Sequence, residues 1–269
     1  MENSKLVAVW GSPGSGTTLT SLKLARELSI LKKNVILILS DAETPMIPVI
    51  VPTAEKVKSL GNLLSLPSIK QIDIFGHCIP AGKSLPLAML GYLREENEAT
   101  YPDYNEIRVG ELIDLSCEFS DYIVVDCSHH LLYNPLTAIA LRDAAVTLRV
   151  VNADPKSLSY FKSQDHFLKD SEFQYDRKIN IINNVYDFQD VHAYEESFGG
   201  KSYILPHVPA LQKQFAEARL MEHITGREGR LYEPQILAIV KEEILNAQQP
   251  EQSTGGEEKY SLQQRSEGA

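Results

Sequence analysis

Apolar and polar stretches alternate along the chain with the lengths of strands and helices. Residues 5–10, KLVAVW, and residues 34–40, NVILILS, are continuous apolar runs of strand length. Between them, residues 19–33 repeat leucine and alanine at the spacing of one helix face. Strands that are apolar throughout are typical of a parallel sheet covered on both faces. Residues 5–40 therefore predict a βαβ unit.

Later parts of the chain continue this pattern. Further buried strands are predicted at residues 121–128, 145–154, 178–185 and 202–206. Helices are predicted at residues 155–173, 209–224 and 233–247. The stretch 42–115 is less regular, and there we expect a strand at 69–76 and helices near 84–97 and 104–117. Five or more buried strands separated by helices predict an α/β fold, in three layers around a doubly wound, mostly parallel sheet.

The composition of the chain indicates how it is divided into domains. The chain has 269 residues, of which 43% are hydrophobic and 23% charged, as in an ordinary globular protein. Residues 1–247 are expected to form one domain. Residues 248–269 are rich in Gln, Glu, Ser and Gly and almost lack apolar side chains. Such a segment cannot bury enough surface to fold, so we expect a disordered tail.

Charge and cysteine usage narrow the class of protein. The formal net charge of -10 disfavours non-specific binding to nucleic acid or anionic lipid. Cys78, Cys117 and Cys127 are scattered, which favours free thiols in a reducing compartment. The chain has neither a signal-peptide pattern at its start nor an apolar run of about 20 residues. We therefore expect a cytoplasmic protein without an integral membrane segment.

Residues 11–18, GSPGSGTT, have the outline of a loop that cradles phosphate. Gly11, Gly14 and Gly16 would let backbone N–H groups approach an anion, and the predicted helix that follows favours negative charge at its start. Thr18 stands where a hydroxyl would contact magnesium, but Thr17 stands where such a loop usually carries lysine. An empty tight turn is the alternative interpretation of the same glycines.

The stretch VAVWGSPGSGTTLTSLKLARELS, residues 7–29, resembles the opening of the MinD/ParA group of P-loop ATPases. That group carries two lysines in its deviant loop, one early and one directly before the threonine. Ser12 and Thr17 occupy the matching positions here. In the family the early lysine reaches across a dimer interface to the partner's nucleotide. The resemblance therefore implies altered dimerisation and weak or absent hydrolysis.

The resemblance extends to later segments. In VILILSDAE, Asp41 matches the family's aspartate that positions the attacking water, a catalytic role. In DYIVVDCSHHL, Asp126 matches the aspartate linked to magnesium, so Thr18 and Asp126 are the expected metal residues. In INIINNV, Asn183 is the better match, and Asn184 the next choice, for the asparagine that reads adenine. The residues that the resemblance assigns to nucleotide binding are Gly11, Ser12, Pro13, Gly14, Ser15, Gly16, Thr17, Thr18, Leu19, Asn183 and Pro206.

Within the group, the sequence is most similar to the TadZ/CpaE branch. That similarity implies a protein that binds ATP with magnesium and localises or assembles a pilus, secretion or conjugation apparatus. Its partners would be the other subunits of that apparatus, with a homodimer as a further expectation. Through such partners the protein would reach the inner face of the membrane or the cell pole.

Two other functions stay open from the residues. One is a scaffold of the same fold that binds no nucleotide, although the acidic residues Asp41 and Asp126 disfavour it. The other is an active ATPase in which Lys83, Arg142 or a partner's arginine replaces the missing charge. A histidine beside the expected γ-phosphate, either His129 or His130, would add positive charge below neutral pH.

Two motifs are decoys on sequence grounds. Residues 76–84, GHCIPAGKS, almost match a second phosphate loop, but the gap from Gly76 is one residue too long and contains proline. Residues 127–130, CSHH, contain ligand types for a metal, yet neighbours on one loop do not make a zinc site without partners from elsewhere. His77 and Cys78 are the partners that the sequence offers.

Overall fold

A computed structural model describes residues 3–52, 59–82, 84–131, 133–168 and 178–248. These residues form one sheet of eight strands in the order β3-β4-β2-β5-β1-β6-β7-β8. Every neighbouring pair is parallel except β3 and β4. The strands are β1 (Asn3–Gly11), β2 (Val35–Leu39), β3 (Ile79–Pro80), β4 (Leu87–Leu90), β5 (Tyr122–Asp126), β6 (Ala144–Asn152), β7 (Ile179–Val185) and β8 (Lys201–Pro206).

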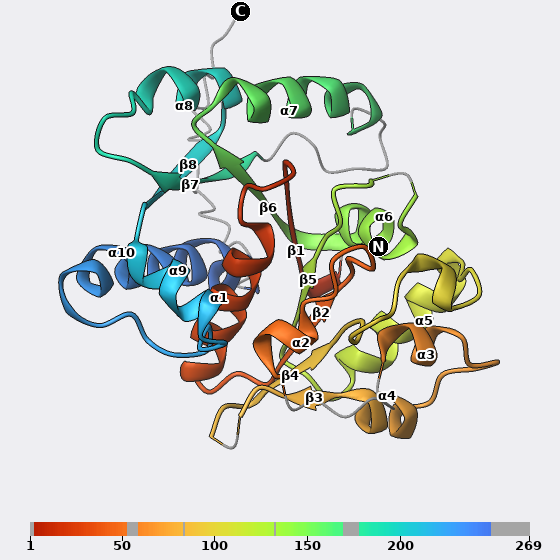
Figure 1. Ribbon diagram of the computed structural model, residues 1–269. Helices are drawn as coiled ribbons and strands as arrows, with labels where there is room; N and C mark the ends of the chain where they lie inside the picture. Colours follow the sequence, from red (N-terminus) through yellow and green to blue (C-terminus); the bar gives the residue numbers. More distant parts are fainter. Residues whose placement is uncertain (1–2, 53–58, 83, 132, 169–177, 249–269) are drawn as a thin grey trace, which may run out of the picture.

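Helices cover both faces of the sheet, as the α/β prediction requires. Figure 1 shows α1, α9 and α10 on one side of the strands and α5 and α6 on the other. The helices are α1 (Thr17–Ile30), α2 (Ile47–Ile50), α3 (Leu60–Leu64), α4 (Gln71–His77), α5 (Glu106–Cys117), α6 (Pro135–Asp143), α7 (Pro155–Leu168), α8 (His192–Phe198), α9 (Pro209–Ala216) and α10 (Gly226–Ile239). Helix α10 continues as a π-helix, Val240–Leu245, and short 3-10 turns are found at Glu98–Thr100 and Asn246–Gln248.

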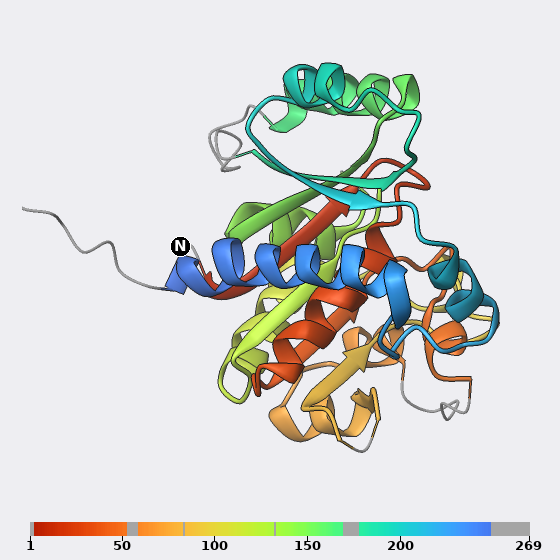
Figure 2. The same cartoon turned by 90° about the vertical axis from the view of Figure 1, so that its left-hand side faces the viewer.

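The continuous apolar strands are explained by two separate cores. Successive residues of a strand point to opposite faces, so Leu37 packs with α1 and α10 while Ile36 packs with α3 to α6. All five residues of β2 and all five of β5 are buried. Figure 2 shows α10 lying across one face of the sheet beside α1. This arrangement confirms the three-layer, doubly wound fold that the sequence predicts.

Two predicted elements are wrong, and both lie in the irregular stretch. Residues 69–76, expected as a strand, contain most of helix α4, where Ile74 is buried while Ile72 is 71% exposed. Residues 84–97, expected as a helix, instead contain β4, which pairs with β2 from Val35 and Leu87 onward. Leu, Ala and Met favour a helix locally, but pairing with β2 on one side and β3 on the other outweighs that propensity.

Other predicted boundaries shift. The helix expected at 209–224 ends at Ala216, because Ala218 adopts a left-handed φ of 54°. The helix expected at 233–247 begins earlier, at Gly226. The predicted helix 155–173 is observed as far as Leu168, and residues 169–173 lie outside the described part of the chain. Nearly all of the predicted tail, 249–269, lies outside it as well.

Among the described residues, no helix combines the length and the apolar character that crossing a bilayer requires. The same part of the chain contains no disulfide between its cysteines.

Candidate functional site

The glycine-rich loop joins β1 to α1 at the carboxyl edge of the sheet. Gly14 and Gly16 adopt positive φ angles of 80° and 86°, which side chains disfavour. A Cβ atom on Gly16 would also lie 2.4 Å from the Nδ2 atom of Asn183. Gly16 therefore requires glycine and Gly14 favours it, and the backbone has the shape that the phosphate-loop prediction needs.

Side chains from neighbouring elements fix the loop in place. The Ser12 hydroxyl is 2.6 Å from the hydroxyl of Ser157, at the start of α7. Lys156, the residue before Ser157 on α7, donates from Nζ to the Pro13 carbonyl at 3.1 Å. On the other side, Asn183 Nδ2 donates to the Ser15 carbonyl at 2.8 Å. The loop is thus held by α7 and β7 before any ligand arrives.

The start of α1 is open to an anion. Its N-cap, Gly16, offers no side chain to the first N–H groups, and its first turn contains no acidic residue. These unpaired N–H groups and the helix dipole favour negative charge there. The hydroxyl of Thr17, which stands at the lysine position, is 3.1 Å from the Ser15 hydroxyl. Thr17 therefore supports the loop and brings no positive charge.

Asp126 ends β5 beneath the loop and is only 2% exposed. The Ser21 hydroxyl donates to its Oδ1 at 3.1 Å, and the Thr18 side chain forms a further hydrogen bond to it. Burial raises the pKa of Asp126 from its ordinary 3.8 to about 7; these two hydrogen bonds oppose the rise and the nearby Asp41 adds to it. The structure thus brings together the two residues predicted to bind magnesium.

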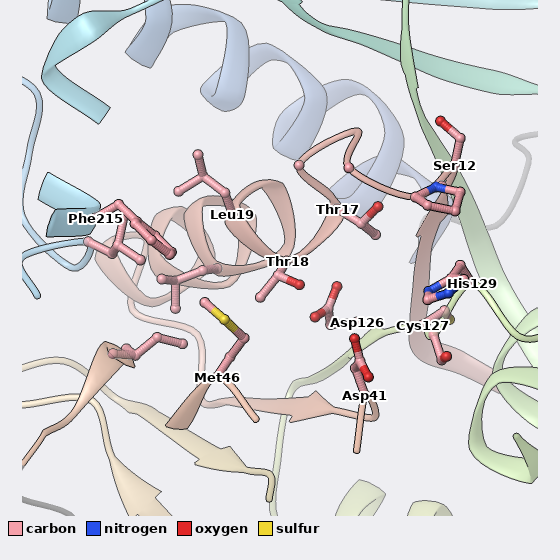
Figure 3. A pocket seen from close by; sticks show the side chains of 18 residues that line it. Ser12, Thr17, Thr18, Leu19, Asp41, Met46, Asp126, Cys127, His129 and Phe215 are labelled. Carbon is pink, nitrogen blue, oxygen red and sulfur yellow. The ribbon is translucent and has the colours of Figure 1, made fainter. Parts of the chain in front are cut away.

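Asp41 follows β2 and faces the same space. Its Oδ1 accepts backbone N–H groups from Glu43 at 2.8 Å and Thr44 at 3.2 Å, which orients the carboxyl group. Figure 3 shows the side chains of Asp41, Asp126 and Thr18 around one central hollow. The carboxyl ends of the neighbouring strands β2 and β5 therefore bring the predicted catalytic and metal residues to one place.

This hollow of about 270 Å³ carries an unusual balance of charge. None of the described residues that line it is lysine or arginine, whereas Asp41 and Asp126 are acidic and His129 stands at its edge. Arg142, a predicted substitute, forms ion pairs with Glu106 and Asp143 instead and is not part of the lining. Lys83, the other predicted substitute, lies outside the described residues. A divalent cation with oxygen ligands fits this set of donors, because the Thr18 hydroxyl and the Asp126 carboxyl meet here.

A second hollow continues from the first along the loop. Gly14, Gly16, Leu19 and Phe215 line both hollows. Further along, the second is lined by residues that include Asn183, Asn184, Pro206, Val208 and Leu211. The predicted adenine residues thus lie together, although the Asn183 amide is engaged with the loop and Asn184 Oδ1 is 2.7 Å from His207 Nδ1.

Lys23 is a site residue that the sequence reasoning missed. It lies on α1, is 1% exposed, and donates from Nζ to Gln214 Oε1 at 2.9 Å and to the Leu220 carbonyl at 2.7 Å. Burial, assisted by the nearby Arg26, lowers the pKa of Lys23 to about 8. The segment that it anchors supplies Phe215 and Leu220 to the wall of the hollow. Lys23 shares its side of the predicted helix with the polar residues Thr20, Arg26 and Glu27, so the sequence pattern gives no signal of its burial.

The two decoy motifs have different outcomes. In GHCIPAGKS, the described residues 76–82 end α4 and form edge strand β3, and none of them lines the hollow. In CSHH, the two histidines lie beside a third ligand type, which is Glu43 and not His77 or Cys78, the partners that the sequence offers. Glu43 follows Asp41 by two residues, so only the fold brings it to His129 and His130.

Comparison with known proteins gives a consistent result for the fold. No protein-family model matches the sequence, and no curated protein matches it either. Solved structures do match. A ParA family ATPase from Chlorobium tepidum TLS aligns with a TM-score of 0.70 and 16% identity, over 88% of this chain and 98% of that one. The cell division ATPase MinD of Pyrococcus furiosus aligns with a TM-score of 0.70 and 14% identity, over 89% of this chain and 99% of that one.

A third match is the septum site-determining protein MinD from Pyrococcus horikoshii OT3, whose structure is a complex with Mg-ADP. It aligns with a TM-score of 0.68 and 15% identity, over 87% of this chain and 95% of that one. At these identities the likeness concerns the fold. The chain has the α/β fold of the MinD and ParA ATPases.

Proposed function

We propose that this protein binds ATP together with magnesium in the two joined hollows beside the glycine-rich loop. The observation that carries the proposal is the meeting of Thr18 and Asp126 under an open helix start. The loop would hold the phosphates with its backbone N–H groups, and Asn183, Pro206 and Phe215 would border the base. The Mg-ADP complex of the similar MinD from Pyrococcus horikoshii supports this choice of ligand.

Each residue of the site would have a defined task. Thr18 and Asp126 would hold magnesium, which neutralises charge on the phosphates when bound. Asp41, fixed by the N–H groups of Glu43 and Thr44, would orient a water molecule toward the terminal phosphate. Gly11 to Leu19 would form the cradle around the triphosphate.

Hydrolysis at this site should be weak or absent. Phosphoryl transfer depends on positioning and on positive charge around the transferred group. The described lining contains no lysine or arginine, so that charge would come from magnesium alone. An active ATPase would need a cation from a partner or from Lys83. A scaffold that binds no nucleotide is the remaining alternative, and the orientation of Asp41 and Asp126 toward one hollow weighs against it.

Such a protein would act as a nucleotide-dependent organiser. Its resemblance to the TadZ/CpaE branch supports a role in localising or assembling a pilus, secretion or conjugation apparatus. We expect the protein to work in the cytoplasm, with other subunits of that apparatus and a second copy of itself as partners. The missing lysine at Ser12 suggests that dimerisation differs from that of a nucleotide-bridged dimer.

Calorimetric titration of magnesium-ATP into the purified protein tests the proposal. We expect binding by the natural protein and no detectable binding by Asp126→Ala. The variant Asp114→Ala changes an exposed aspartate of α5 and should bind like the natural protein. Absence of binding up to millimolar ATP would refute the proposal for the isolated chain and favour the scaffold. A turnover assay on a protein that binds would then distinguish a switch from an enzyme.

A further inference from the structure

Three metal-ligating side chains gather at the edge of the first hollow. Glu43 comes from the loop after β2, and His129 and His130 come from the loop after β5. One ligand atom from each residue lies within 4.8 Å of the other two. His130 Nε2 is 3.1 Å from Glu43 Oε1, and the two imidazole rings lie with their centroids 4.0 Å apart. Two strand ends thus build a cluster that neither loop contains alone.

An ion pair does not account for this cluster. The contact between His130 and Glu43 satisfies one imidazole and the carboxylate. Within the described part of the chain, the hydrogen bonds give the ring of His129 no partner, although that ring lies against His130. A single cation between the three groups would employ both imidazoles and the carboxylate.

The backbone of each ligand is already fixed. Glu43 N–H donates to Asp41 Oδ1, and Tyr160 on α7 donates its hydroxyl to the His129 carbonyl at 2.9 Å. The His130 N–H donates to the Ser128 hydroxyl at 3.2 Å. Pre-positioned ligands lose less conformational freedom on binding, which favours a metal site.

We infer that Glu43, His129 and His130 form a binding site for Zn²⁺. Two imidazoles and one carboxylate are a recognised zinc ligand set, with a fourth position left for water or another ligand. In a tetrahedral site, ligand atoms lie about 3.3 Å apart for bond lengths near 2 Å. The pair formed by His130 and Glu43 already has this spacing, so only the ring of His129 has to approach. Imidazole ligands also favour zinc over magnesium, which selects oxygen.

The position of this zinc site gives it a consequence for the hollow. His129 lines the hollow that also contains Asp41 and Asp126, so bound zinc would place two positive charges at its edge. The same ion would join the loop after β2 to the loop after β5. This consequence rests on the proposed function, whereas zinc binding itself does not.

Competition with a chromophoric chelator tests the site in the absence of nucleotide. After dialysis against a chelator, the full chain should take up one equivalent of zinc. Glu43→Gln, His129→Ala and His130→Ala should each weaken zinc binding about tenfold or more. The matched control is His192→Ala, which removes an exposed imidazole beside Glu195 and Glu196 on α8 and should change nothing.

Several results would overturn the inference. The natural protein could take up no zinc, the double variant H129A/H130A could take up as much zinc as the natural protein, or His192→Ala could lose as much zinc affinity as the three ligand variants. Circular dichroism of each variant shows whether it has kept the fold.

Cobalt in place of zinc tests the ligands directly. His130→Cys should retain one equivalent of cobalt and gain a thiolate-to-metal charge-transfer band that the natural protein lacks. That band in the natural protein would indicate coordination by one of its own cysteines, such as the neighbouring Cys127, and would overturn the ligand set. Magnesium-ATP titrations with and without zinc form a separate arm. If ATP fails to bind, the proposed function fails while the zinc result stands.

Discussion

Replacing Asp126 by asparagine should stabilise the metal-free protein while it removes the magnesium site. Asparagine has nearly the same shape, and its carbonyl oxygen can still accept the Ser21 hydroxyl that now lies 3.1 Å from Oδ1. What the substitution removes is a charge in a place that is 2% exposed. Burying that charge is the main cause of the raised pKa.

The raised pKa gives the size and the sign of the effect. One pKa unit corresponds to about 1.4 kcal/mol, so a rise from 3.8 to about 7 corresponds to about 4 kcal/mol. The folded protein holds a proton on Asp126 that the unfolded chain has lost between these two pH values. The stability linked to this proton is complete below pH 3.8 and is lost as the pH rises through about 7.

Urea denaturation in the presence of EDTA, followed by circular dichroism, measures the effect. The free energy of unfolding of Asp126→Asn, relative to the natural protein, should increase by about 2–3 kcal/mol between pH 5 and pH 8. Asp114→Asn, on the exposed face of α5, serves as the control for adding an amide and should show no such trend. A difference between Asp126→Asn and the natural protein that is constant with pH would refute the reasoning, since it would mean that Asp126 ionises as easily when folded as when unfolded.

Three further substitutions test other parts of the site. Gly16→Ala should lower the free energy of unfolding by about 1–3 kcal/mol in urea, because of its positive φ and its contact with Asn183, whereas Gly110→Ala in open space on α5 should not destabilise. Thr17→Lys should tighten magnesium-ATP binding, measured by calorimetry, about tenfold or more, since a charged hydrogen bond contributes about 1.5–3 kcal/mol. The uncharged control Thr17→Met should not tighten the binding. Between pH 8 and pH 10 the unfolded chain keeps a proton on Lys23 that the folded protein has lost, so the free energy of unfolding of the natural protein should rise by about 2 kcal/mol. Lys23→Met should lack this rise, and equal pH profiles of the two free energies would contradict the reasoning.

The parts of the fold that the sequence predicts best are those with one dominant signal. Strands β2 and β5 are buried on both faces, so every residue is apolar up to their polar ends, and the shortness of these runs together with their valines and isoleucines favours a strand over a helix. The segments Gln71–His77 and Leu87–Leu90 have competing signals instead. Their apolar residues fit either a helix or a strand, and the outcome depends on which segment reaches β2 to pair with it. That contact is not local and leaves no trace in the periodicity.

The residues of the site also divide into those with a local sequence signal and those that depend on distant contacts. Local signals, the glycines of the loop and the aspartates that end apolar strands, indicated Gly16, Asp41 and Asp126, and the structure places them around connected hollows. The contributions of Lys23 and Glu43 depend on segments far apart in sequence. Lys23 holds residues nearly two hundred positions later, and Glu43 meets histidines from another strand end. Periodicity cannot predict such contacts, because they follow from strand order.

The acidic character of the hollow is an argument for a cation in the working protein. An ionised Asp126 destabilises the folded chain, and the hydrogen bonds from Thr18 and Ser21 offset that cost only in part. An asparagine at this place would keep the shape without the cost. The two carboxyl groups, with no lysine or arginine among the described residues of the lining, would also repel the phosphates of a free nucleotide. A divalent ion held by Thr18 and Asp126 would remove both difficulties, so we expect a nucleotide to enter this site as its magnesium complex.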